Sequence, residues 1–204
     1  MLTVIDYKMI NLGSILNMLK KVGATDIVVA NRPEQVMNAS KIIMPGVGHF
    51  DSAINILNQL ELIEPLKQKA LKEKIPFLGI CLGMQLMTKK SEEGTQPGLG
   101  FVRAKVKRFN FPSDLNLRVP HMGWNQVDIV KDSKLFTNKD QKRFYFVHSY
   151  YVECEDSKDI LTTTHHGSVF VSAFEHENLI GAQFHPEKSH NYGLEVFHNF
   201  MEKY

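Results

Sequence analysis

Short apolar runs alternate with longer segments of helical periodicity through the first half of the chain. The runs typical of strands are "LTVID", "DIVVA", "KIIMP" and "PFLGI", whereas residues 11–22, a stretch from Phe50 into the 60s and another ending at Lys74 have helical patterns. Strands that alternate with helices indicate βαβ units, which build a parallel sheet with helices on both faces. The first half therefore predicts a doubly wound α/β fold.

Beyond about Leu99, strand-like segments follow one another directly. They are "GFVRAKVKRF", "WNQVDIV", "RFYFVHSYYVE", "ILTTT", "VFVSAFE" and "LIGAQFH", and a helical tail spans residues 192–203. This succession predicts antiparallel strands added to the mostly parallel sheet in the C-terminal half. At 204 residues, we expect the chain, residues 1–204, to form a single domain.

The composition is that of an ordinary globular protein, with 43% hydrophobic and 23% charged residues and a net charge of +2. Because the charges nearly cancel, we expect no nucleic-acid partner. The longest nearly uncharged apolar run, residues 75–87, is shorter than the roughly 18 residues that a membrane span needs. The N-terminus has the pattern of a strand and not of a secretory signal, and the two cysteines lie far apart. We therefore expect free thiols in a reducing cytoplasm.

Cys81 lies between Gly79 and Gly83, where an apolar strand changes into a helical segment. A nucleophile on such a sharp turn is lifted out of the sheet toward a pocket, and flanking glycines permit the crowded backbone. The N-terminus of the following helix would favour the thiolate. The alternative is that Cys81 is a small buried apolar residue, as most cysteines in apolar runs are.

A nucleophilic thiol needs a base, and the base needs an orienting acceptor. In "GAQFHPEKS", His185 closes a strand-like run and Glu187 follows two residues later, which in extended chain is the same face. Glu187 is thus placed to fix the tautomer of His185. Taken alone, however, a histidine in a turn is more often a surface residue.

Two further stretches carry candidate binding groups. In "MPGVGHF", Gly46 and Gly48 would allow the N–H around Val47 to stabilise an oxyanion together with the N–H of Leu82, although glycines also serve a simple strand-to-helix turn. In "YFVHSYY", His148, Ser149 and Tyr150 end an aromatic strand and form either core or a pocket wall.

Five motifs in this order, "PGVGHF", "GICLGMQ", "PHMGWN", "YFVHSYY" and "QFHPEKS", resemble the class I glutamine amidotransferases over essentially the whole chain. Within that family, the chain is most similar to the branch formed by the glutaminase subunits of imidazole glycerol phosphate synthase in histidine biosynthesis. The resemblance implies a flavodoxin-like fold and a catalytic triad of Cys81, His185 and Glu187. It further implies that glutamine is bound by Gly46, Gln85, His148, Ser149 and Tyr150. The implied oxyanion donors are Val47 and Leu82.

The resemblance also implies a partner, a (β/α)8-barrel synthase subunit that receives ammonia and makes imidazole glycerol phosphate and AICAR. L-Glutamine is the implied substrate, and neither a cofactor nor a metal is implied. Family members of this branch are poor glutaminases alone and become active when the barrel binds a ligand. The positions that match the docking face are Asn11, His121, Met122, Trp124, Tyr145 and Lys188; Trp124 could instead belong to the core.

One segment departs from the family pattern. Where the family has Asp-Tyr-Gly-x-Gly-Asn after the first strand, this chain has "DYKMIN", so Lys8 and Ile10 replace both glycines. If the turn needs a positive φ, Ile10 would be strained, and we expect the loop to take another path.

Three alternatives remain open. A second-copy paralogue would supply ammonia for amidine formation on a surface sugar, and a catalytically silent module would only bind a synthase. A metal or redox site built from His165, His166, His185 and His190 lacks recognisable ligand spacing and a second thiol near Cys81.

Overall fold

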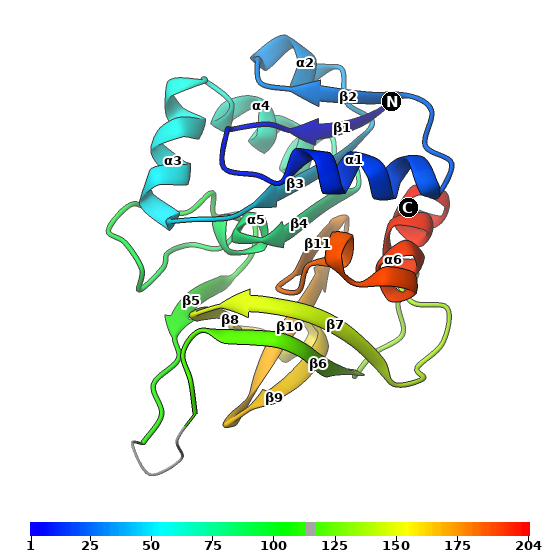
Figure 1. Cartoon of the computed structure of the whole chain (residues 1–204). Helices are drawn as coiled ribbons and strands as arrows, with labels where there is room; N and C mark the ends of the chain where they lie inside the picture. The colour runs from blue at the N-terminus through cyan, green and yellow to red at the C-terminus, as the bar shows by residue number, and fades with distance from the viewer. Residues whose placement is uncertain (113–116) are drawn as a thin grey trace.

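A mixed sheet flanked by helices forms the centre of the molecule (Figure 1). The computed structural model describes residues 1–112 and 117–204. The parallel part of the sheet consists, in spatial order, of β2 (Ile27–Ala30), β1 (Leu2–Ile5), β3 (Lys41–Gly46), β4 (Phe77–Cys81) and β11 (Leu179–Ala182). The predicted parallel sheet is confirmed.

The antiparallel strands continue from β11. They are β10 (Ser168–His176), β9 (Ile160–His166), β6 (His121–Ile129) and β7 (Lys142–His148), while β8 (Tyr150–Cys154) pairs with both β10 and β5 (Ala104–Arg108). The predicted antiparallel set is confirmed with one correction. The run "RFYFVHSYYVE" forms two strands, β7 and β8, because the chain leaves β6 at Ser149 and pairs with β5 instead.

Helices cover both faces of the parallel strands (Figure 1). On one face lie α1 (Leu12–Lys21) and α6 (His190–Lys203); on the other lie α2 (Pro33–Met37), α3 (Phe50–Gln59), α4 (Ile63–Lys67), the π-helical turn η1 (Gln68–Lys72) and α5 (Leu82–Leu86). In α1, Ile15, Met18 and Leu19 are buried at the helical spacing that an inward-facing stripe requires. The sequence did not predict α2, whose five residues are too few to establish a helical period.

Strand residues alternate between the two cores. In β3, Ile42 and Met44 pack against the side of α3, and Ile43 packs against the side of α1 and α6. This alternation explains the continuous apolar runs, because a parallel strand with helices on both faces buries both of its sides.

The carboxyl ends of β3, β4 and β11 lie side by side, since the strands are parallel neighbours. Gly46 is directly opposite Cys81 in the register of β3 and β4. Ligands bind at the carboxyl ends of the strands in open α/β sheets, so this edge is the expected place for a site. Among the helices of the described residues, none has the length and apolar character needed to cross a membrane.

Candidate active site

Cys81 is the last residue of β4 and has a strained backbone, with φ +53° and ψ −110°. Non-glycine residues rarely adopt a positive φ, and the surrounding structure has to impose it. A Cβ atom at Gly83 would overlap the carbonyl oxygen of Met44, and one at Gly79 would lie 2.6 Å from the sulfur of Met87. Both glycines are therefore required by close packing, and the predicted turn is confirmed. The following helix, α5, is short, with five residues.

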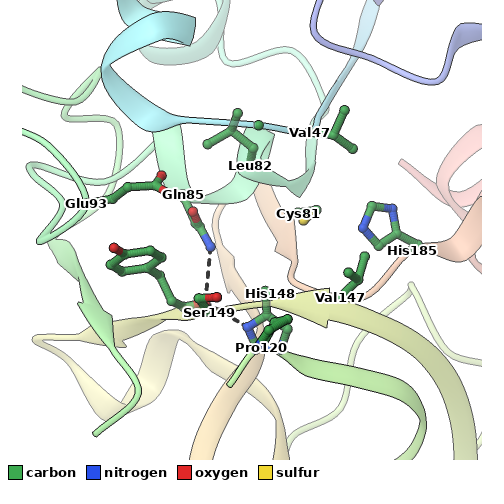
Figure 2. A pocket seen from close by; sticks show the side chains of 12 residues that line it. Val47, Cys81, Leu82, Gln85, Glu93, Pro120, Val147, His148, Ser149 and His185 are labelled. Atoms are coloured by element: carbon green, nitrogen blue, oxygen red, sulfur yellow. Dashed lines mark hydrogen bonds between the residues drawn. The ribbon is translucent and has the colours of Figure 1, made fainter. Parts of the chain in front are cut away.

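His185 follows β11 and points its imidazole toward Cys81 (Figure 2). Its backbone N–H donates to the carbonyl of Tyr145 (2.9 Å), and its Nδ1 lies 2.7 Å from Oε1 of Glu187. The side chains of His185 and Glu187 are only 2% and 3% exposed. Among the described residues, Nε2 of His185 has no hydrogen-bond partner, so it is available on the side of the thiol.

The electrostatics favour a charged His185. Burial alone would lower its pKa, but the negative charge on Cys81 and the hydrogen bond and charge of Glu187 outweigh burial and raise the pKa to about 10. An imidazolium beside a thiolate is the arrangement that cysteine hydrolases use to activate the sulfur. The three residues can thus act as nucleophile, acid–base group and orienting acceptor.

Cys81 and His185 open into one cavity of about 320 Å³ (Figure 2). This size lies at the lower end of the range for small-molecule sites, about 300–1,000 Å³. The lining residues are Val47, Gly48, Cys81, Leu82, Gln85, Glu93, Pro120, Val147, His148, Ser149, Tyr150 and His185. Of the predicted binding residues, Gly46 lies behind this wall, where the hydroxyl of Tyr7 occupies the space beside its Cα atom.

Glu93 is a cavity residue that the sequence analysis missed. It belongs to the segment "SEEGTQPGLG", and its Oε2 accepts a hydrogen bond from the N–H of Phe50 (2.9 Å). A carboxylate in the cavity is suited to a substrate amino group. Two adjacent acids in a glycine-containing loop were the only available signal, and they did not point to this cavity.

The predicted oxyanion donor Val47 does not face the cavity with its N–H. That group donates to the carbonyl of Met9 (2.8 Å), in the loop that carries Lys8 and Ile10. Lys8, and not Ile10, has the positive φ, at +66°. In this conformation the N–H of Val47 is therefore not free to stabilise an oxyanion, and its role as a donor stays a prediction. Leu82 lines the cavity as the first residue of α5, where helix N–H groups have no intrahelical partner.

Gln85, His148 and Tyr150 hold one wall of the cavity together. The amide of Gln85 and Nδ1 of His148 both donate to the carbonyl oxygen of Tyr150, at 3.2 and 2.7 Å. Nε2 of His148 lies 2.9 Å from Nδ1 of His121, whose Nε2 is 3.0 Å from the amide nitrogen of Asn125. Since an amide NH2 group only donates, Asn125 fixes the proton of His121 on Nδ1, where it is donated to His148.

His121 is the clear correction among the predicted partner-facing residues. It is 4% exposed and belongs to the wall just described, whereas Met122 and Trp124 are 62% and 39% exposed. Successive side chains of a strand point to opposite faces, so His121 cannot share a face with Met122 in β6. Burial and the charge of His166 lower the pKa of His121 to about 4. For His148, burial outweighs the bond to Tyr150 and lowers the pKa to about 3.

The other predicted docking residues reach the surface. Asn11 and Lys188 are exposed and Tyr145 is half-buried. Trp124 stacks on His190 (ring centroids 5.5 Å apart), and the Lys188 ammonium lies 5.6 Å from the centre of the Tyr145 ring. Trp124 is therefore not a core residue.

In the part of the chain that the structure describes, no arrangement of side chains supports the alternative redox or metal site. Cys81 and Cys154 are both free thiols, and burial raises the pKa of Cys154 to about 12. Among these residues, no three His, Cys, Asp or Glu side chains are grouped to hold a metal ion.

Comparison with known proteins gives the class of the protein. The sequence profile of the family "Glutamine amidotransferase class-I" matches residues 3–204, and the chain belongs to this family. It is 49% identical over its full length, and the full length of the relative, to "Imidazole glycerol phosphate synthase subunit HisH 2" of Methanococcus maripaludis. It is 44% identical, over 98% of both chains, to "Imidazole glycerol phosphate synthase subunit HisH" of Leptospira borgpetersenii.

A solved structure described as a glutamine amidotransferase shares the fold, with a TM-score of 0.76 at 14% identity over 98% of this chain and 97% of the other. The predicted flavodoxin-like class I glutamine amidotransferase fold is thereby confirmed. The chain is an enzyme of the glutamine amidotransferase class.

Proposed function

We propose that this chain is the glutaminase subunit of an imidazole glycerol phosphate synthase. It hydrolyses glutamine and channels the ammonia to a (β/α)8-barrel subunit that makes imidazole glycerol phosphate and AICAR in histidine biosynthesis. The names of its full-length relatives support this assignment. The observation that carries the glutaminase part is that Cys81 and His185, with Glu187 behind it, meet in one cavity. The free thiols support the cytoplasmic location that we expected.

The first half of the reaction forms a thioester. The Cys81 thiolate adds to the side-chain carbonyl carbon of glutamine, and negative charge builds on the carbonyl oxygen near the N–H of Leu82. The tetrahedral intermediate collapses, the C–N bond breaks, and His185 transfers its Nε2 proton to the departing amine. Ammonia and an acyl-enzyme result.

The second half restores the enzyme. Neutral His185 takes a proton from water, the hydroxide adds to the thioester, and the C–S bond breaks to release glutamate and the thiolate. Glu187 keeps Nδ1 of His185 protonated throughout, so that Nε2 carries every proton transfer. The carboxylate of Glu93 is placed to bind the amino group of glutamine.

Ammonia that escaped into water would largely become ammonium, which has no lone pair for attack, so a shielded path to an acceptor is needed. The surface formed by Met122, Trp124, Tyr145 and Lys188 is the proposed docking face. Its exposed tryptophan and methionine match the residue types that are enriched at protein interfaces.

The test is glutamate release by the complex with the barrel protein that co-purifies with this chain. Glutamine-dependent glutamate release and product formation are expected for the wild type, and both are lost in Cys81→Ala. Synthesis from added ammonia should survive in the same variant, because the barrel carries that step. Glutamine use by the Cys81→Ala complex would overturn the proposal, and a wild-type complex without glutamate release would favour a catalytically silent module.

The second-copy paralogue is a second candidate, favoured by two observations. Lys8 and Ile10 replace two glycines in the segment that leads to Asn11, a predicted docking residue, and two relatives, from M. maripaludis and Pseudomonas aeruginosa, carry the numbered name HisH 2. The co-purifying barrel protein distinguishes the two. Turnover of the imidazole precursor with ammonia supports histidine biosynthesis; turnover of only a nucleotide-free sugar supports the paralogue.

A further inference from the structure

A buried glutamine lies behind the nucleophile. Gln183, just after β11, is 0% exposed, and its backbone N–H donates to the carbonyl of Ser172 (2.8 Å). Its Nε2 is 3.7 Å from Sγ of Cys81, and its Oε1 accepts a hydrogen bond from Nε2 of Gln85 (3.0 Å). A buried amide needs partners for its polar atoms, and one of those partners here is the reacting sulfur.

The hydrogen-bond network fixes which end of this amide faces the sulfur. Gln85 is in contact with the carbonyl oxygen of Tyr150 (3.2 Å), which only accepts, so the atom there must be the Gln85 nitrogen. The same nitrogen contacts Gln183, so Gln183 must present its oxygen to it. The NH2 group of Gln183 is consequently directed at Cys81. Tyr150 thus determines the orientation of two amides in series.

We propose that Gln183 is a catalytic residue that donates a hydrogen bond to the sulfur of Cys81, and that Gln85 is a positioning residue that holds its amide in the donating orientation. The inference rests on the proposed function, which makes Cys81 the nucleophile. Hydrogen bonds to a charged acceptor are stronger than those between neutral groups, so the donor favours the thiolate over the thiol.

The same donor acts at both ends of the cycle. Before attack it holds the thiolate in the rotamer that faces the cavity. When the thioester collapses, the electron pair of the C–S bond returns to sulfur, and the N–H stabilises the departing thiolate. Attack itself neutralises the sulfur, so the donor affects the pH dependence and the hydrolysis of the thioester more than the first addition.

The decisive variant is Gln183→Glu. It keeps the shape of the side chain and an oxygen that can accept from Gln85, but places a carboxylate oxygen toward the sulfur. Gln59→Glu, an exposed position near the end of α3, is the matched control for the added charge. Gln183→Met, which removes the donor without adding charge, serves as the second variant should Gln183→Glu fail to fold.

The readout is the alkylation rate of Cys81 by iodoacetamide as a function of pH in the full chain, followed by peptide mass. It reports thiolate formation without requiring glutaminase activity. For Gln183→Glu we expect the midpoint to shift upward by at least about one pH unit, and the alkylation rate at pH values below both midpoints to fall about tenfold. Gln183→Met should shift the midpoint upward by about half a unit, and Gln59→Glu should leave it unchanged.

An unchanged midpoint in Gln183→Glu, or in Gln183→Met where the former does not fold, overturns the inference. A uniform loss of rate at all pH values does so as well, because it indicates a structural role alone. The two proposals fail separately. A wild-type complex without glutamate release refutes the glutaminase function and leaves the alkylation shift to be measured, whereas an active wild type with no shift refutes only the role of Gln183.

Discussion

At the scale of single residues, the site depends on groups that tolerate no added atom. Gly83 touches the carbonyl of Met44 so closely that any side chain forces β3 and α5 apart. Gly79 and the positive φ of Cys81 make the same turn rigid. The nucleophile is therefore positioned by backbone packing, which the glycine–cysteine–glycine pattern of the sequence was sufficient to predict.

Gly83→Ala should lower the free energy of unfolding by about 2–3 kcal/mol, because the methyl group overlaps a backbone atom. Gly13→Ala is the matched control: it lies in α1 with no atom within 4 Å of its Cβ position. Alanine is the better helix former, so this control should gain about 0.5–1 kcal/mol. Urea denaturation of both variants measures the difference. Equal effects would contradict the packing argument.

Glu187→Gln tests the orienting carboxylate. Removing its charge lowers the pKa of His185 from about 10, so the alkaline limb of the glutaminase pH profile should move to lower pH. We expect kcat/KM to fall at least about a hundredfold, because the tautomer of His185 is no longer enforced. Glu177→Gln, which changes an exposed carboxylate paired with Lys74, should have no effect. A drop in rate with an unshifted pH profile would argue against this role.

At the scale of elements, strand β6 shows what the sequence could and could not predict. The alternation rule was available from the start and separates His121 from Met122 and Trp124. The prediction places all three on the docking face because the motif "PHMGWN" as a whole matches the family's docking segment. The break at Ser149 was not predictable, because every residue of "RFYFVHSYYVE" suits a strand and the change of partner depends on long-range pairing.

The buried pair His121 and His148, in the cavity wall that also contains Gln85 and Tyr150, predicts that the folded protein loses stability in acid. Both have lowered pKa values in the folded protein, about 4 and about 3, and bind protons in the unfolded chain near pH 6.5. Between the folded-state pKa values and pH 6.5, the unfolded state therefore binds more protons than the folded state. The free energy of unfolding falls as the pH drops below about 6.5. From pH 6.5 to pH 5, the pair should cost about 2–4 kcal/mol.

His121→Phe isolates this contribution. At pH 7 the variant should be less stable by about 1–3 kcal/mol, because Nε2 of His148 loses its donor. Between pH 6.5 and pH 5, the free energy of unfolding of this variant should fall by about half as much as that of the wild type, since one titrating group has been removed. His198→Asn, an exposed histidine of α6, should retain the wild-type slope. The same dependence of stability on pH in His121→Phe and in the wild type would contradict the claim that His121 is buried in its neutral form.

At the scale of the whole molecule, the topology assembles the site from distant parts of the sequence. β4 supplies Cys81, the segment after β11 supplies His185 and Glu187, and the junction of β7 and β8 supplies the opposite wall. The motifs identified these residues, but nothing local showed that Gln183 and Glu93 would join them. The hydrogen bond from Val47 to Met9 was equally invisible, because it links two loops that only the fold brings together.

The proposed docking face makes a prediction at the same scale. Trp124→Ala should weaken binding of the barrel subunit by about 2 kcal/mol, or roughly thirtyfold in Kd, because exposed tryptophans are frequent hot spots. Met37→Ala, an exposed methionine on α2 at the far end of the molecule (Figure 1), is the control and should bind normally. Titration calorimetry with the barrel protein measures both. Normal binding by Trp124→Ala would show that the barrel subunit docks on another surface.

The most direct measurement is covalent labelling of the complex with a diazo-ketone analogue of glutamine, followed by peptide mass mapping. The account predicts one adduct per chain, located on Cys81, prevented by excess glutamine and strongly slowed in His185→Ala. An adduct on Cys154, or labelling of Cys81 that glutamine does not prevent, would contradict the claim that the sulfur of Cys81 attacks glutamine in this cavity.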